Sequence, residues 1–266
     1  MFPSVRFLGV DLYFWMIIIG VVAAIFYFRF VSAKVGISAK LYNHVVLTGI
    51  CGVVVGYLAS ILVQDFYSFI ATGEWRVGAG STFLGGLIGG LAFFHLLYFL
   101  IGKKVFKDKE HITNYNTMIS VLMPAIVLAH GFGRIGCLFA GCCYGKLTDA
   151  WYGIEMYEHG VLEKRIPTQL IEAIFLFYLA LILTIILIKY SNRHTVAIYM
   201  ISYGVFRFLI EFIRDDPRGS LGSSVFSPSQ LISIVMVIAG IVLLILYHTT
   251  FKKKKEIESW RKTRLY

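Results

Sequence analysis

One short stretch of the chain places two charged side chains where charge is costly. Tyr203, Arg207 and Glu211 are spaced by four residues within the apolar stretch 195–213, so they share one face of a helix. A charged side chain inside a membrane costs about 3 kcal/mol, and such residues usually mark a site or a pathway. A guanidinium carries a planar fork of donors that suits a phosphate or a carboxylate. Arg207 and Glu211 are therefore candidate functional residues, with a mutually neutralising pair as the alternative.

A second candidate site is the glycine-rich stretch from His130 to Gly145, which contains Arg134. Glycines let backbone N–H groups converge and approach a ligand closely, which forms a concavity for anions. Gly133 and Gly136 flank Arg134, so a phosphate headgroup is the expected ligand. The same glycines predict that the apolar stretch 117–129 ends early as a broken helix. Non-helical backbone at membrane depth is tolerated only where protein or a wet cavity surrounds it.

The same stretch holds four potential metal ligands, namely His130, Cys137, Cys142 and Cys143. Adjacent cysteines rarely share a tetrahedral site, and the chain has no C-x-x-C hairpin. Small packing residues are the favoured interpretation of these cysteines. A disulfide from Cys137 to Cys142 or Cys143 stays open as an alternative if the stretch faces the outside. No metal and no cofactor are predicted.

Further polar side chains stand at the beginnings of two apolar stretches. Gln169 and Glu172 are three residues apart on one helix face, and Gln230 opens the last stretch. These side chains either contact a substrate or cap their helices. Gly85 and Gly86 lie in a run of small residues that favours close contact between membrane helices, and both are also predicted to contact the substrate.

The elements that position these residues follow from composition. Of the 266 residues, 58% are hydrophobic and 15% are charged, against about 25% charged in a typical soluble domain. The chain is therefore predicted to be an integral membrane protein, and a soluble, disordered or disulfide-rich chain is excluded. The net charge of +10 is attributed to basic loops beside anionic lipid rather than to nucleic-acid binding.

Seven apolar stretches predict an all-α bundle of seven transmembrane helices in a single domain, 1–266. Sixteen Lys and Arg residues lie on one side of these stretches and eight on the other. This excess places the N-terminus outside and the basic tail, 248–266, in the cytoplasm. The connection 145–167 is expected to form a small extracytoplasmic cap. The predicted spans are 12–28, 45–63, 83–101, 117–129, 170–188, 195–213 and 231–247.

Taken together, these blocks resemble the prolipoprotein diacylglyceryl transferase family of bacterial membranes. The most specific block is the signature GRIGC-x3-GCCYG at positions 133–145, and the other blocks follow in the order of the family. They are Tyr13, the run 83–89, the run 167–170 with Glu172, the pair Arg207 and Glu211, and Ser229 with Gln230.

The resemblance implies an enzyme that moves the diacylglyceryl group of phosphatidylglycerol to the lipobox cysteine thiol of a prolipoprotein. Arg134 and Arg207 would stabilise the phosphate, Glu211 would orient Arg207, and Tyr13 would bind the lipid headgroup. The implied partners are phosphatidylglycerol, prolipoprotein signal peptides and membrane lipids, with no nucleic acid. The implied location is the bacterial cytoplasmic membrane. The alternatives are a relative with another lipid or acceptor, and a lipid-binding or transport protein.

The chain departs from the family pattern at four positions. Leu84 and Ile166 stand where the family commonly has histidines, Cys137 where it has Asn, and Cys142 where it has Glu. Two candidate bases and two polar contacts are thus missing. His130 is either a replacement for a missing base or a structural hydrogen bonder.

Overall fold

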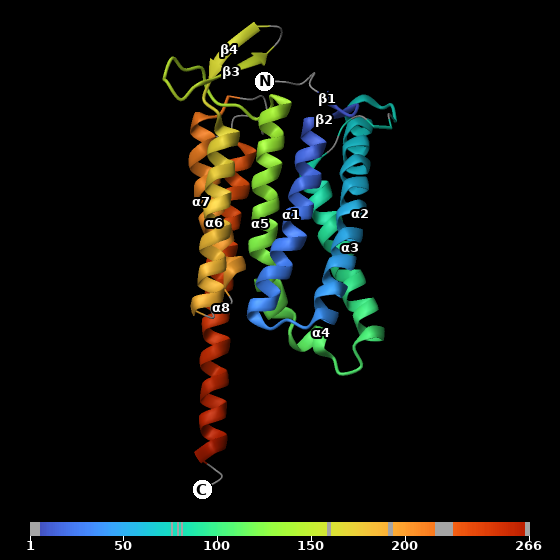
Figure 1. Ribbon diagram of the computed structural model, residues 1–266, viewed down its shortest axis with the longest axis vertical. Coiled ribbons are helices and arrows are strands. Elements are labelled where there is room, and N and C mark those ends of the chain that lie inside the picture. The colour runs from blue at the N-terminus through green and yellow to red at the C-terminus, as the bar shows by residue number, and fades with distance from the viewer. Residues whose placement is uncertain are drawn as a thin grey trace. The chain divides into compact units, whose positions relative to one another are not determined.

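The computed structural model describes residues 6–75, 77–78, 80, 82–158, 161–190, 194–215 and 226–263. Seven of its helices are long and apolar enough to cross a membrane, which confirms the seven predicted spans and the all-α class (Figure 1). These helices are α1 (Leu12–Val35), α2 (Ala39–Thr72), α3 (Phe83–Val105), α5 (Tyr115–Ala140), α6 (Thr168–Tyr190), α7 (Thr195–Ile210) and α8 (Pro228–Thr263). The short elements are α4 (Glu110–Thr113), the 3-10 turn η1 (Glu211–Ile213), and the strands β1 (Arg6–Phe7), β2 (Val10–Asp11), β3 (Ile154–Glu158) and β4 (Val161–Arg165).

The expected break in the fourth span is wrong, because α5 continues through the glycine-rich stretch to Ala140. Each glycine there lowers the helix propensity, but close packing compensates in a membrane bundle. A Cβ at Gly131 would lie 2.5 Å from the ring of Phe177, and one at Gly136 would lie 3.2 Å from Tyr13. The backbone N–H groups of this stretch as far as Ala140 therefore belong to the helix and do not form the expected anion concavity.

Contacts between elements divide the chain into two compact units. The first unit comprises 1–31 and 119–266, and the second comprises 32–118. This division does not test whether 1–266 form a single domain, so the single domain stays a prediction.

In the first unit, α5, α6 and α7 surround a core of apolar side chains. Its buried members are Met123, Val127, Leu176, Leu179, Ala180, Leu183 and Tyr203. Helix α8 approaches α7 closely at Gly204, where a Cβ would lie 3.0 Å from the carbonyl oxygen of Ser233. Helix α1 is tied to α6 by a hydrogen bond of 2.7 Å between the hydroxyls of Tyr27 and Thr184. This bundle holds the polar residues described below.

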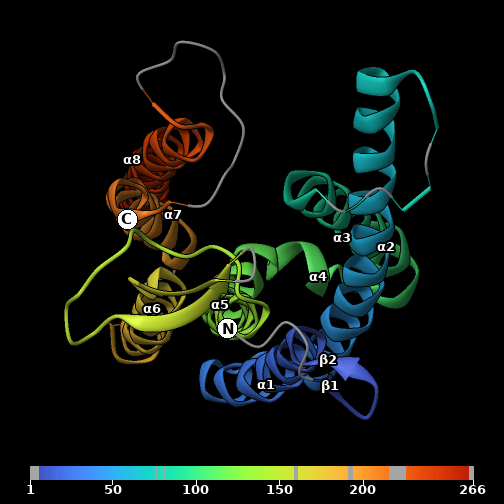
Figure 2. The same ribbon diagram turned by 90° about the horizontal axis from the view of Figure 1, so that it is seen from above.

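The connection 145–167 forms the predicted cap as an antiparallel hairpin of β3 and β4, in which Ile154 pairs with Arg165. Viewed from above, the hairpin lies across the ends of α5 and α6 (Figure 2). Met156 is buried there with Leu138 and Tyr144. At the opposite end of this unit α8 extends to Thr263, so positions 264–266 of the predicted tail lie outside the described residues.

In the second unit, α2 and α3 make a close contact through glycines. A Cβ at Gly56 would lie 2.8 Å from the carbonyl oxygen of Gly86, and one at Gly85 would lie 2.7 Å from Val63. Small residues that let helix backbones approach in this way are typical of membrane helix pairs. Gly85 and Gly86 are therefore explained by helix packing, and their predicted contact with substrate stays a prediction.

The α2–α3 contact leads to a stability prediction. Gly56→Ala should lower the thermal unfolding midpoint of the purified protein, because the new methyl group meets backbone that cannot rotate away. Gly49→Ala in the same helix is the matched control, since a Cβ there meets no atom of the described chain within 4 Å. It should be neutral or raise the midpoint, because alanine favours helix over glycine by about 1 kcal/mol. Equal midpoints for the two variants would contradict the packing role.

Candidate active site

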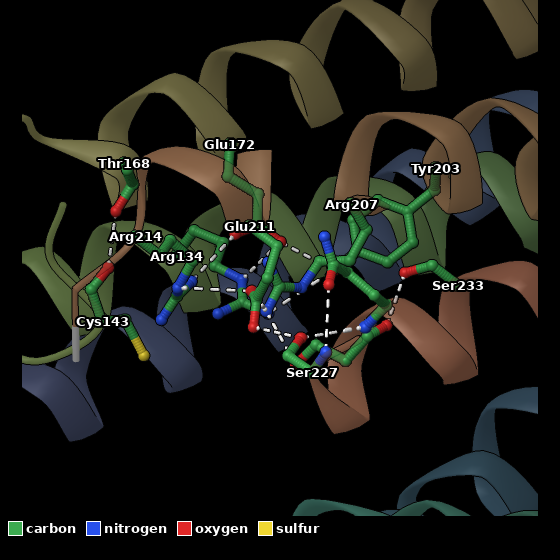
Figure 3. Close-up of polar contacts among 12 residues, drawn as sticks. Arg134, Cys143, Thr168, Glu172, Tyr203, Arg207, Glu211, Arg214, Ser227 and Ser233 are labelled. Atoms are coloured by element: carbon green, nitrogen blue, oxygen red, sulfur yellow. Dashed lines mark hydrogen bonds and ion pairs between the residues drawn. The ribbon is translucent and has the colours of Figure 1, made fainter. Parts of the chain in front are cut away.

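Five charged side chains from four elements of the first unit meet in one network (Figure 3). Arg134 comes from α5, Glu172 from the first turns of α6 and Arg207 from the last turn of α7. Glu211 begins the 3-10 turn η1, and Arg214 follows that turn. The structure thus brings together Arg134, Glu172, Arg207 and Glu211, four of the residues that were singled out from the sequence.

Glu172 lies at the centre of one half of the network and is completely buried. Its Oε1 accepts a hydrogen bond of 2.7 Å from the Tyr203 hydroxyl and lies 3.0 Å from Nε of Arg134. Its Oε2 lies 3.8 Å from Nη1 of Arg214. A buried carboxylate is stable only when it is paired and hydrogen-bonded. Glu172 is therefore the residue that fixes two guanidinium groups from different elements.

Glu211 organises the other half of the network. Its Oε2 lies 2.8 Å from Nη2 of Arg207, one helical turn earlier, and 3.9 Å from Nε of Arg214. Its Oε1 accepts a hydrogen bond of 2.8 Å from the Ser227 hydroxyl. Nη2 of Arg207 also donates to the Ser229 hydroxyl at 3.1 Å. This geometry supports the expectation that Glu211 orients Arg207.

The network carries more positive than negative charge. Three arginines face two glutamates, which leaves a formal surplus of one positive charge among these five residues. In addition, Nη1 of Arg207 is buried without a hydrogen-bond partner among the described residues. A buried donor without an acceptor is costly, and a guanidinium fork matches the oxygens of a phosphate. The arrangement is therefore suited to hold a singly charged phosphate diester.

His130 lies one helical turn before Arg134 on α5, beside this network. Its Nδ1 lies 3.4 Å from the Tyr199 hydroxyl, and its ring contacts the ring of Tyr203 edge-on at 5.0 Å. It is half-buried. Its position allows either of the two roles given above, a base or a structural hydrogen bonder, and the choice stays a prediction.

Tyr13 and Gly136 lie where α1 meets α5. Gly136 contacts Tyr13 and Met16 of α1, so its lack of a side chain lets the two helices approach. A Cβ at Gly133, by contrast, would meet no atom of the described chain within 4 Å. Gly133 is therefore better placed than Gly136 for the predicted contact with a substrate.

Gln169 and Gln230 both make contacts within the chain. Nε2 of Gln169 donates to the carbonyl oxygen of Cys142, and the residue is completely buried. Gln230 caps α8, because its Oε1 accepts from the backbone N–H of Ser227 and its own N–H donates to the Ser227 hydroxyl. This reciprocal pair of hydrogen bonds is a capping box. It agrees with the expectation that Gln230 caps its helix. A substrate contact by either side chain stays a prediction.

The loop between α5 and the hairpin is fixed beside the network at Gly145. A Cβ there would lie 2.8 Å from the carbonyl oxygens of both Ile166 and Ile213, so only glycine fits. The N–H of Gly145 donates to Ile166, and the N–H of Lys146 donates to Ile213. Three segments that are distant in sequence therefore meet at one point next to Arg214.

The three cysteines of the signature lie close together, although their spacing argued against a shared metal site. Their sulfur atoms lie within 4.8 Å of one another, and His130 is not part of this cluster among the described residues. All four cysteines of the chain are free thiols in the structure. Hydrogen bonds from Cys137 and Cys142, followed by the charges of Arg214 and Arg134, lower the pKa of the Cys143 thiol below its ordinary value. The site therefore favours a thiolate at this position.

No role in the site was assigned from the sequence to four polar residues that the network uses, namely Tyr203, Arg214, Ser227 and Ser229. Tyr203 and Ser229 were noted only for their spacing and for the resemblance. Arg214 had a usable signal, because it follows Glu211 by three residues and Arg207 by seven, on one helix face. Ser227 had one too, since Ser-x-x-Gln before an apolar run predicts a capping box.

Comparison with known proteins identifies the family of this chain. The family model described as prolipoprotein diacylglyceryl transferase matches residues 2–246. A phosphatidylglycerol–prolipoprotein diacylglyceryl transferase 2 of Clostridium perfringens is 33% identical over 87% of this chain and 88% of its own length. The corresponding transferase of Clostridium tetani is 34% identical over 85% and 88%, and that of Geobacter sulfurreducens is 29% identical over 87% and 88%. With its seven spans, its buried arginine network and these relatives, the chain belongs to the prolipoprotein diacylglyceryl transferase family of multi-pass cell membrane proteins.

Proposed function

We propose that this protein transfers the diacylglyceryl group of phosphatidylglycerol to the cysteine thiol of a prolipoprotein lipobox, the first step of lipoprotein maturation. Its relatives carry the names of both substrates. The observation that carries the proposal is the buried network of three arginines and two glutamates, in which Nη1 of Arg207 has no hydrogen-bond partner among the described residues and can bind the phosphate of this lipid.

The reaction makes one bond and breaks one. The sulfur of the prolipoprotein attacks the glyceryl carbon next to the phosphate, and the bond from that carbon to the phosphate oxygen breaks. The electron pair stays on that oxygen, and the thiol proton is released. Glycerol phosphate leaves with two negative charges where the diester had one, so charge grows on the phosphate during the step.

The network is built to stabilise this growing charge. Preorganised donors aimed at developing charge in a site shielded from water are among the strongest contributions to catalysis. Arg207 is held by Glu211 and Ser229, and Arg134 by Glu172. Because these partners fix the guanidinium groups beforehand, little reorganisation is needed when the charge forms.

The distribution of basic residues also suggests the orientation of the protein. The network lies at the hairpin end of its unit, away from the basic end of α8. The excess of Lys and Arg on the other side supports a cytoplasmic tail and an outer N-terminus.

The test is direct. The purified protein in lipid nanodiscs should release glycerol phosphate from phosphatidylglycerol when a lipobox peptide is added, and the peptide should gain the mass of one diacylglyceryl group. A peptide with serine in place of the lipobox cysteine is the control and should give no release. Release without any gain of mass on the cysteine peptide would contradict the proposed acceptor.

A further inference from the structure

The turn that follows helix α5 brings three cysteine thiols close together. Helix α5 ends at Ala140, and Gly141 has a φ of 67° and Cys143 a φ of 66°. The N–H of Cys142 then donates back to the carbonyl oxygen of Cys137 at 3.2 Å. This tight reversal brings the sulfurs of Cys137, Cys142 and Cys143 within 4.8 Å of one another.

The loop that carries two of these thiols is anchored from α6. The Thr168 hydroxyl donates to the carbonyl oxygen of Cys143 at 2.7 Å, and Gln169 donates to that of Cys142. Both anchoring side chains are completely buried. A non-glycine residue with positive φ, such as Cys143, persists only where its surroundings hold it. The position of the three sulfurs is thus fixed by the fold.

The donor set fits a soft divalent cation. In a tetrahedral zinc site the Zn–S distance is about 2.3 Å, which puts the sulfurs about 3.8 Å apart. The three sulfurs need to move together by about 1 Å or less to reach that spacing. Arg134 lies one helical turn before Cys137, so its charge helps to offset the negative charge of three thiolates.

Three protein ligands leave one position of a tetrahedral ion open. Closed structural zinc sites use four protein ligands, whereas catalytic sites use three and take water or substrate at the fourth position. Cys142 is the exposed member of the cluster, so the ion would be reachable from outside the protein. In the proposed transfer, the acceptor that must lie beside Arg134 is the lipobox cysteine of the prolipoprotein, which is itself a thiol.

We propose that Cys137, Cys142 and Cys143 bind one zinc ion whose fourth position takes the lipobox thiol of the prolipoprotein as a thiolate. This inference rests on the proposed function for the identity of the fourth ligand. A thiol that coordinates zinc loses its proton, here to water, and is then the nucleophile. Its sulfur forms the bond to the glyceryl carbon, while the carbon–oxygen bond to the phosphate breaks and the electron pair leaves with glycerol phosphate. The alkylated sulfur is a thioether, a weaker ligand, which favours release of the product.

The first experiment measures metal content. The full-length protein, purified from cells grown with zinc, should contain one zinc ion per chain by mass spectrometry of the metal. Cys137→Ser, Cys142→Ser and Cys143→Ser should each lower the zinc affinity by at least about tenfold. Cys51→Ser is the matched control, because Cys51 lies in α2 outside the cluster, and it should keep the zinc of the parent. Two results would overturn the site. One is the same zinc content in all four variants, and the other is the absence of zinc from the parent protein.

The second experiment tests the fourth position without using activity. With Co²⁺ in place of zinc, the protein should show thiolate-to-cobalt absorption and the visible bands of a tetrahedral ion. A lipobox peptide should shift these bands, and the serine peptide should not. Cobalt bands that ignore the cysteine peptide would overturn the assignment of the fourth ligand.

A third measurement separates this inference from the proposed function. Removing zinc with a chelator should abolish transfer to the peptide, and adding zinc should restore it. Full transfer by the metal-free protein would overturn the inference and leave the proposed function standing. A zinc-loaded protein with the expected cobalt response but no glycerol phosphate release would instead contradict the proposed function.

Discussion

Arg207→Ala should lower kcat for glycerol phosphate release by about 10²–10³-fold, the usual loss when one preorganised donor to developing charge is removed. The buried Nη1 of Arg207 is directed at no acceptor among the described residues, so its partner is expected to be the phosphate. KM for phosphatidylglycerol should change less than kcat, because the charge on the phosphate is larger in the transition state than in the bound lipid. Steady-state kinetics in nanodiscs of defined lipid content measure both constants.

Two further variants give this prediction its controls. Arg207→Lys keeps the charge but has a single nitrogen in place of Nη2, which contacts Glu211 and Ser229, and Nη1, which is left for the phosphate, so it should recover only part of the rate. Arg29→Ala removes an exposed arginine of α1 and should leave kcat unchanged. A kcat for Arg207→Ala close to that of Arg29→Ala would remove Arg207 from the phosphate site.

Glu172→Ala should cost the protein about 3–5 kcal/mol of stability, because it leaves buried arginine charge without its partner. Glu172 is completely buried and lies 3.0 Å from Arg134 and 3.8 Å from Arg214. The thermal unfolding midpoint in detergent micelles should therefore fall, and the transfer rate should fall with it. Tryptophan fluorescence during heating follows the unfolding.

Glu172→Gln distinguishes the loss of charge from the loss of shape. The amide oxygen still accepts the hydrogen bond of the Tyr203 hydroxyl, so part of the lost stability should return. Gln169→Leu in the same turn of α6 removes a neutral contact to the loop and should cost much less than Glu172→Ala. A Glu172→Ala protein as stable as the parent would show that the arginines are paired in another way.

The spans were predictable because the lipid environment imposes a simple rule on the sequence. Each helix that crosses the membrane must present apolar side chains over about 20 residues, and the seven stretches do so. The pair of Arg207 and Glu211 was predictable for a similar reason, since a spacing of four places both on one helix face. In both cases the information is local in the sequence.

The other features of the site could not be predicted, because they depend on contacts between segments that are distant in the sequence. The partners of Glu172 come from α5, α7 and the residue after η1, and no spacing rule connects them. The glycines of α5 were misinterpreted as a break because Phe177 and Tyr13, which pack on them, lie far away in the chain. The cysteine cluster depends on the positive φ of Gly141 and Cys143, which composition does not reveal.

The surplus charge of the arginine network has a consequence for the resting protein. Among these five residues three guanidinium groups face two carboxylates, so a bound phosphate places negative charge where positive charge predominates. Ligand binding and folding are then thermodynamically linked, and the stabilisation grows with the logarithm of the ligand concentration. Phosphatidylglycerol in the surrounding bilayer is therefore both a reactant and a counter-ion of the native state.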